Sequence, residues 1–221
     1  MHVAALQGHL EVVALLLEHP GIDVSAASNN GRTALHMAAS LGHLEVVAVL
    51  LEHPGVDVSA ATNMGLTALH LAALQGRLET VKLLLEHPGV DVRATSNDGE
   101  TALHLAALHG HDGIVALLLG HPGIEVGATN RAGNSALHYL AMNWPAANPD
   151  VLRRLLTSPD TDPNLKNHMG DSPLMMLLRW AIMDSHLRTL IMDQLRIFME
   201  CDRVDLELKD QEGRSLEDLT R

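Results

Sequence analysis

Residues 33–36 read Thr-Ala-Leu-His, and this tetrapeptide decides the fold because it returns at a fixed interval. It recurs at residues 67–70 and 101–104, and again with Ser as its first residue at 135–138, so that each step is 34 residues. A fixed period of about 20–50 residues is typical of an array in which each repeat stacks on its neighbours. Stepping back by the same interval from His36 lands on His2, so the sequence begins inside a repeat.

Residues 33–65 show how one repeat is expected to fold. Thr33 opens a short helix over about residues 34–40, and Gly42 ends it, because glycine adopts the left-handed conformation at low cost. A second helix is expected over about residues 44–52, where Val and Leu make it apolar over more than one face, as in a helix between two neighbours. Residues 56–65 follow Pro54-Gly55 as a projecting, turn-rich loop.

These repeats resemble ankyrin repeats. The resemblance is carried by the Thr-x-Leu-His segments, by Gly-His between the two helices, and by the glycine before each Thr or Ser. Ala34, Ala68 and Ala102 stand where the family usually has Pro, and one extra loop residue lengthens the family's usual period of about 33. The resemblance implies an all-α solenoid of stacked helix-turn-helix units with projecting β-hairpin loops.

We expect one continuous solenoid with a regular and an irregular part. Residues 1–142 hold regular repeats, the first of them truncated, and residues 143–221 hold repeats with insertions. Residues 144–149 are expected to lengthen one interhelix turn, and residues 174–183 and 187–200 to form two longer helices. A polar half-repeat at 215–219 is expected to cap the stack. Because no such cap precedes residue 1, we expect the chain to be an excerpt of a longer protein.

Charge limits the classes of partner. The net charge is -12, which argues against nucleic acid or an anionic membrane surface. Residues 1–76 contain a single basic side chain, Arg32, so a basic protein or peptide is favoured as partner. No apolar run reaches the roughly 18 residues of a membrane span. The lone Cys201 fits a reducing compartment. We expect a cytoplasmic monomer, with the nucleus as a second location.

Fifteen histidines raise the question of a metal or acid–base site, but twelve of them occupy repeat-fixed positions. The resemblance implies that the Thr-x-x-His histidine hydrogen-bonds to the loop backbone and to the neighbouring Thr. Copies one repeat apart cannot share a zinc ion, whose ligand bonds are about 2 Å long. The sequence therefore predicts no catalytic residue, no metal and no cofactor. The methionines between residues 169 and 199 are interpreted as gap-fillers in an irregular core.

In such solenoids the loop tips and first helices form a concave binding face. Positions that differ between repeats are candidates for that face. The alternative is that they are solvated positions whose residue type varies because no function constrains it. They are Asn30, Arg32, Leu41, Met64, Leu66, Gln75, Asp98, Glu100, His109, Asn134, Asn143 and Trp144. Leu41, Met64 and Leu66 are expected to form an apolar spot, and Trp144 suits a binding hot spot. The resemblance also makes Asn164 a candidate hydroxylation site.

The leading hypothesis is therefore a non-enzymatic scaffold or adaptor that grips another protein on its concave face. One alternative is a regulatory or targeting segment of a larger enzyme or signalling protein. A second alternative is an engineered binder, which the irregular later repeats oppose because idealised arrays avoid insertions.

Overall fold

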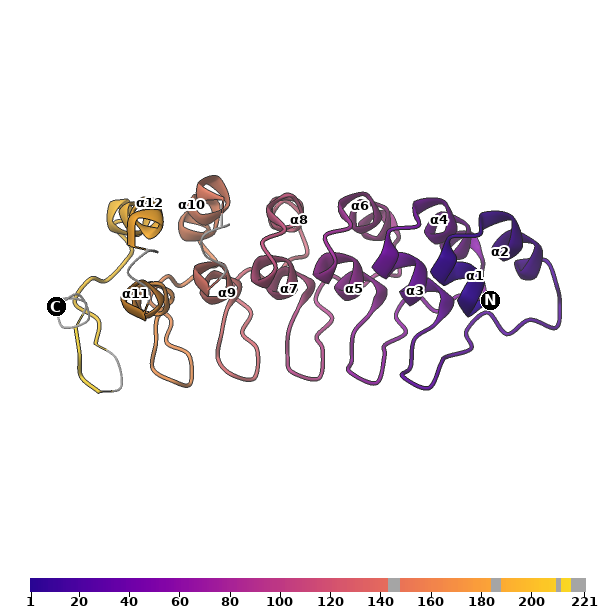
Figure 1. Ribbon diagram of the computed structural model, residues 1–221, viewed down its shortest axis with the longest axis horizontal. Helices are drawn as coiled ribbons and strands as arrows, with labels where there is room; N and C mark the ends of the chain where they lie inside the picture. Colours follow the sequence, from indigo (N-terminus) through magenta and orange to yellow (C-terminus); the bar gives the residue numbers. More distant parts are fainter. Residues whose placement is uncertain (143–147, 184–187, 210–211, 216–221) are drawn as a thin grey trace. The chain divides into compact units, whose positions relative to one another are not determined.

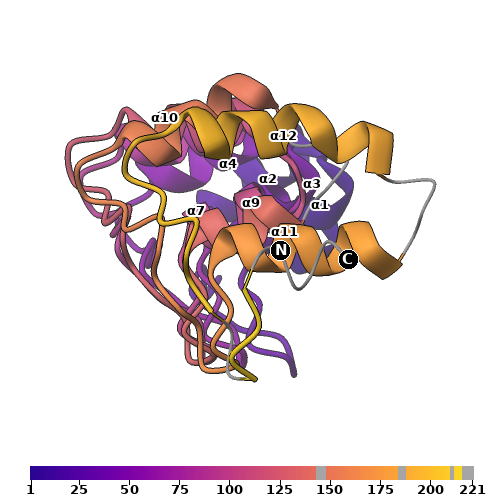
Figure 2. The same cartoon turned by 90° about the vertical axis from the view of Figure 1, so that its left-hand side faces the viewer.

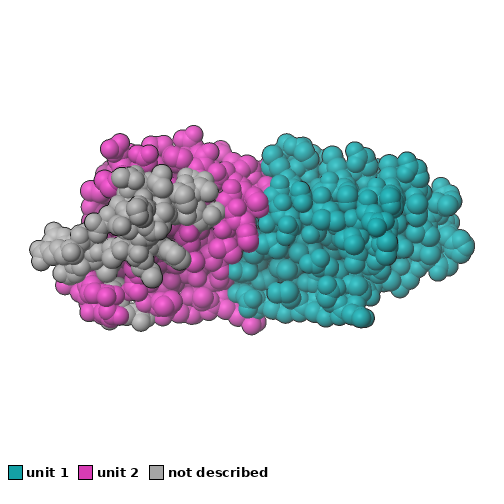
Figure 3. Space-filling model, in the orientation of Figure 1, with its two compact units in different colours: residues 1–106 teal, residues 107–221 magenta. Residues whose placement is uncertain are grey.

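The computed structural model describes residues 1–142, 148–183, 188–209 and 212–215, with the backbone alone at 180–183 and 188–191. Its internal contacts divide the chain into two compact units, residues 1–106 (unit 1) and 107–221 (unit 2), shown in Figure 3. Each unit is described by itself. This division does not test the expected boundary between regular and irregular repeats at residue 142, which stays a prediction.

Unit 1 is built from helix pairs in two rows (Figure 1). The first row contains α1 (His2–Gln7), α3 (Ala34–Leu41) and α5 (Ala68–Leu74), and the second contains α2 (Leu10–Leu17), α4 (Leu44–Glu52) and α6 (Leu78–Glu86). Helices of one row pack side by side, and each pair packs across the rows. α7 (Ala102–Leu108) begins at the end of the unit. The helix bounds confirm the spans predicted around residues 34–52.

The core of unit 1 is made of small residues on the first row and larger aliphatic residues on the second. Ala38, Ala39 and Ala72 are fully buried, and they allow neighbouring first-row helices to approach closely. Val47 and Leu84 are equally buried on α4 and α6. Burying one such aliphatic side chain is worth roughly 1.5–3 kcal/mol, so stacking rather than helix propensity stabilises these short helices.

Unit 2 contains α8 (Asp112–Leu119), α9 (Ala136–Met142), α10 (Pro149–Thr157), α11 (Pro173–Met183) and α12 (Arg188–Glu200). α9 packs on α11 and α10 on α12, while α11 and α12 run alongside each other (Figure 2). The two longer helices predicted around residues 174–200 are confirmed. Residues 143–147 and 216–221, which include the predicted turn insertion and most of the cap, lie outside the described residues.

The interpretation of the methionines between residues 169 and 199 as core gap-fillers is only partly right. Met175 is fully buried in the core of unit 2, as a gap-filler should be. Met169, Met192 and Met199 are 67%, 55% and 66% exposed, so for these three the interpretation is wrong. Met169 lies at a loop tip, and the other two are exposed on α12, which buries Ile197 and Phe198. Composition alone could not separate these environments.

The loops between helix pairs project from the first row of unit 1 and end in tight turns (Figure 1). Each turn is closed by two backbone hydrogen bonds. One runs from Ser28 N–H to Arg32 O, Thr62 N–H to Leu66 O and Ser96 N–H to Glu100 O, all 2.9 Å, and the other runs from the N–H of Gly31, Gly65 and Gly99 to the carbonyl O of Ser28, Thr62 and Ser96, at 2.8–2.9 Å. Among the described residues the sole β-bridge joins Thr129 and Ser135 in unit 2. The predicted β-hairpins are therefore hairpin turns without extended ladders.

Candidate functional site

A buried histidine joins each first-row helix to the next turn. The Nδ1 atom of His36 accepts the Thr33 backbone N–H at 3.1 Å and lies 2.9 Å from the Thr33 hydroxyl. Since Nδ1 accepts, the proton of the neutral ring is on Nε2, which donates to Leu66 O at 3.0 Å in the following turn. Burial lowers the pKa of His36 below its ordinary value and so favours this neutral form.

The same arrangement recurs in the next repeat and in unit 2. His70 accepts the Thr67 N–H at 3.1 Å and bonds to Glu100 O at 3.0 Å, and burial lowers its pKa as well. In unit 2, His138 accepts the Ser135 N–H at 3.1 Å and reaches Asp171 O at 3.2 Å. The hydrogen-bonding role implied for these histidines is thus confirmed.

A second set of bonds joins one turn directly to the next. Asn63 donates its backbone N–H to Asn30 O at 3.1 Å and its side-chain amide to Asn29 O at 3.0 Å. Asn97 repeats this pattern with Met64 O and Asn63 O, both at 2.9 Å. The sequence predicted no role for Asn63 and Asn97 in joining turns. Their recurrence at residues 29, 63 and 97, one period apart, was the available signal.

Glycine is required where consecutive turns touch. Gly65 has φ +75°, and a Cβ placed there would lie 2.7 Å from both Asn97 N and Asn97 Oδ1. Gly31 is in the same situation against Asn63. An L-residue would therefore suffer both an unfavourable backbone conformation and a collision with the next turn.

The predicted surface residues of unit 1 occupy three kinds of position. Asn30, Met64 and Asp98 are exposed at the turn tips, and Met64 is 63% exposed. Arg32, Leu66 and Glu100 are half-buried on the inner side of the same turns. Leu41 and Gln75 are exposed at the C-terminal ends of α3 and α5.

The expected apolar spot of Leu41, Met64 and Leu66 is divided between two places. Met64 and Leu66 share one turn, which leads directly into the N-terminus of α5. Leu41 lies at the C-terminal end of the neighbouring α3, about 10 Å of helix from its first residue. The structure thus groups Met64 with Leu66 and sets Leu41 apart from the turns.

The residues predicted for binding in unit 2 are less accessible than those of unit 1. His109 is exposed just after α7, whereas Asn134 is half-buried and its Oδ1 accepts the Asn167 amide at 2.9 Å. Asn143 and Trp144 lie outside the described residues. The Asn164 amide donates to Arg203 O and its Oδ1 accepts the Asp205 N–H, both at 2.7 Å. Asn164 therefore links successive loops, and its hydroxylation stays a prediction.

Unit 2 also contains an arginine that sequence reasoning missed. The Arg203 guanidinium donates to Leu156 O at 3.1 Å, to Ser158 O at 2.7 Å and to Thr161 O. These carbonyls belong to the last turn of α10 and the residues after it, so Arg203 caps that helix from the following repeat. A hollow of about 450 Å³ is lined by Arg153, Cys201, Arg203 and neighbouring residues. The Arg203 guanidinium at this hollow is hydrogen-bonded to backbone carbonyls.

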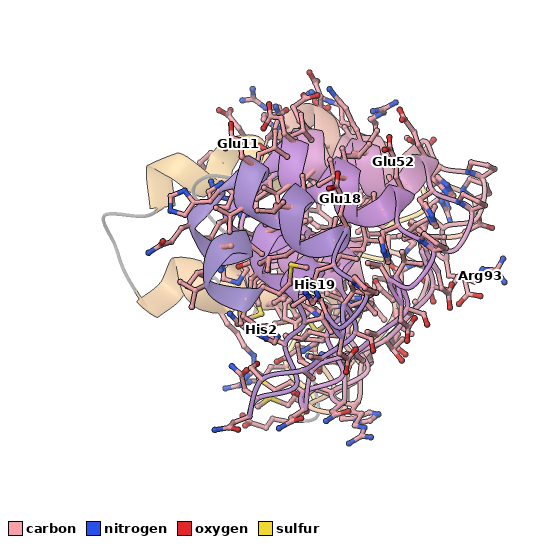
Figure 4. All side chains as sticks on the ribbon, turned by 90° about the vertical axis from the view of Figure 1, so that its right-hand side faces the viewer. His2, Glu11, Glu18, His19, Glu52 and Arg93 are labelled. Carbon is pink, nitrogen blue, oxygen red and sulfur yellow. The ribbon has the colours of Figure 1, made fainter. Side chains whose placement is uncertain are left out.

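Much of the acidic charge of unit 1 lies away from the turns. Glu11, Glu18 and Glu52 are exposed on the second-row helices, on the side opposite the loop tips (Figure 4). At the loop starts, Asp57 accepts the Ser59 hydroxyl at 2.7 Å, and this hydrogen bond lowers the pKa of the Asp57 carboxyl. The turns themselves carry charges of both signs, from Arg32, Asp98 and Glu100.

The described residues contain no cluster of three or more His, Cys, Asp or Glu side chains suited to a metal ion. No helix within the described ranges is long and apolar enough to cross a membrane. The arrangement that repeats is a stiff framework that presents variable side chains.

Comparison with known proteins agrees with this framework. A family model for ankyrin repeats, in three copies, matches residues 1–62, 55–130 and 88–167. No curated protein matches the chain. Ankyrin repeats are generally protein–protein interaction modules and are typically non-catalytic. Because the matches extend over most of the sequence and the histidine framework recurs in both units, the chain belongs to the ankyrin-repeat family.

Proposed function

We propose that the protein is an interaction scaffold or adaptor, and that unit 1 binds a segment of another protein on its turn surface. The turn surface is defined as Asn30, Arg32, Met64, Leu66, Asp98 and Glu100. The observation that carries this proposal is that these side chains differ from turn to turn while the hydrogen bonds beneath them are the same. A constant framework with variable, accessible side chains is suited to recognition.

The framework supports binding through preorganisation. The histidine bonds to Leu66 O and Glu100 O and the asparagine bonds between turns hold the surface in one conformation before a partner arrives. A partner that docks on it therefore loses little free energy to the ordering of loops. Met64 adds an exposed apolar side chain that gains from being covered.

We further infer that the protein acts as a monomer in a reducing intracellular compartment. The single cysteine, which is free and half-buried, supports this location, because structural disulfides are rare in such compartments.

Affinity capture from cell lysate with quantitative mass spectrometry tests the proposal. The native chain is compared with a Met64→Arg, Asp98→Arg variant and with a matched control, Leu15→Arg, Glu52→Arg. All four positions are exposed, and the control pair lies on α2 and α4 with the same total change of charge. We expect partners of the native chain to be lost by the first variant and kept by the control. Equal retention by both variants would refute binding at the turn surface.

A further inference from the structure

We infer that the turn surface of unit 1 selects an extended segment, in the polyproline II conformation, that carries an acidic and a basic side chain on either side of an apolar one, at three-residue intervals. This inference rests on the proposed function, because it describes the partner of the same surface. It is carried by the order of side chains across three consecutive turns and by the bonds that hold those turns in register.

The three turns differ in chemical character. The first presents Arg32 beside the neutral Asn30, the second presents Met64 and Leu66, and the third presents Asp98 and Glu100. The surface therefore changes from positive through apolar to negative over two steps of the array. A ligand with the opposite order of charges can satisfy both ends and cover Met64 between them.

The two end charges are available to a ligand. Within the described residues the Arg32 guanidinium forms no ion pair. Asp98 is exposed, and the hydrogen bond described for it uses its backbone N–H, which donates to Ser96 Oγ at 3.2 Å. Both groups can pair with a ligand without first breaking an ion pair of their own.

Register between the turns is set by hydrogen bonds rather than by flexible linkers. Asn63 N–H bonds to Asn30 O across the first pair of turns, and Asn97 N–H bonds to Met64 O across the second. The helices behind the turns, α3 and α5, pack directly on each other. Packed helix axes are about 8–10 Å apart. A segment in the polyproline II conformation has three residues per turn and rises about 3.1 Å per residue, so its side chains three residues apart lie on the same side at about 9 Å. One repeat therefore corresponds to three residues of an extended ligand in this conformation.

An extended ligand fits this surface better than a helical one. The apolar part is confined to Met64 and Leu66 in a single turn, with polar or charged turns on either side. An amphipathic helix would need a continuous apolar stripe to bury its own apolar face. A single apolar side chain of an extended segment can be covered by Met64 and Leu66 of the second turn alone.

The test uses labelled seven-residue peptides and fluorescence anisotropy with the full chain at low salt. The peptides share a neutral background and carry Glu-Leu-Lys, Glu-Leu-Glu, Lys-Leu-Lys or Glu-Ser-Lys at positions 1, 4 and 7. We expect the first to bind the native chain best, by about threefold to fivefold over each peptide with one reversed charge, as for an exposed ion pair. Replacing Leu by Ser should weaken binding further, because Met64 then loses its apolar partner.

Protein variants then change the preferred peptide. Asp98→Arg leaves Glu100 in the third turn and should therefore abolish the preference for Glu-Leu-Lys over Glu-Leu-Glu. Arg32→Glu should make Lys-Leu-Lys the preferred peptide, whereas Glu52→Arg on α4 should leave the order unchanged. Equal affinity for all four peptides, an order that the variants do not change, or no measurable binding would each overturn the inference. The proposed function fails separately, when lysate partners survive the Met64→Arg, Asp98→Arg substitutions. Circular dichroism of each variant shows whether it remains folded.

Discussion

Replacement of Gly65 by Ala is the sharpest test of how consecutive turns are held together. Gly65 has φ +75°, and the left-handed conformation costs an L-residue roughly 1–2 kcal/mol. The added Cβ also lies 2.7 Å from the Asn97 backbone N, so the third turn must move away. That movement breaks the bonds of Asn97 to Met64 O and Asn63 O, at about 0.5–1.5 kcal/mol each. We expect a total loss of about 2–5 kcal/mol.

Gly42→Ala is the matched control within the same unit. Gly42 has nearly the same conformation, φ +79°, but its added Cβ would lie 2.9 Å from Cδ of the Arg77 side chain. Arg77 can move at the cost of one hydrogen bond, from its Nε to Ser40 O at 3.2 Å, which is worth about 0.5–1.5 kcal/mol. The control should therefore lose the conformational cost of about 1–2 kcal/mol and at most this one bond.

Urea unfolding followed by circular dichroism measures both losses, and hydrogen exchange at residues 62–66 and 96–100 shows whether the turns open locally. Arrays of repeats can unfold in parts, so the exchange data decide where the free energy is lost. Equal losses for the two variants, with unchanged exchange at the turns, would show that contact between turns contributes nothing. In that case contacts between turns would not preorganise the turn surface.

Two further predictions concern pH and the α10 cap. Burial lowers the pKa of His36 and His70 in the folded chain, so the unfolded chain takes up protons first as the pH falls below about 6.5. The free energy of unfolding should therefore decrease as the pH falls further. Urea midpoints that stay constant between about pH 7.5 and 5.5 would contradict this prediction. Arg203→Ala removes the donor of three backbone carbonyls, so it should destabilise unit 2 by about 1–3 kcal/mol and speed hydrogen exchange near residue 161. The control Arg153→Ala removes only an exposed ion pair of 3.4 Å and should cost less than about 0.5 kcal/mol. Thermal or urea unfolding of both variants measures the difference.

Interactions that repeat within one period were predictable from the sequence. The period of 34 residues located the helices, and α4 (Leu44–Glu52) has the predicted bounds, because a helix is specified by local apolar spacing and by its caps. The resemblance to ankyrin repeats correctly implied the bonds of His36 to Thr33 and to the next loop. The exposure of Met64 and Asp98 also followed from their positions at turn tips.

The period by itself does not predict the exposure of a side chain where the later repeats change their chemistry. Asp171 follows Arg32, Leu66, Glu100 and Asn134 in the series of inner turn residues, yet it is only 4% exposed. Its Oδ1 pairs with Arg179 Nε of α11 at 3.1 Å. No equivalent arginine occurs at the matching positions of the earlier repeats, where the residue is Ser40, Leu74 or Leu108. Asp171 is thus buried against a partner, whereas the earlier residues of the series are half-buried.

The sequence by itself determined the repeat, the helix spans and the set of variable side chains. All three depend on residues close together in the chain or on a period that can be read directly. Only the tertiary structure decided which variable side chains remain accessible, as Asn134 and Asn164 show by their bonds to neighbouring loops. Those bonds join residues more than 30 positions apart, and they depend on how one repeat packs on the next, which local sequence patterns do not specify.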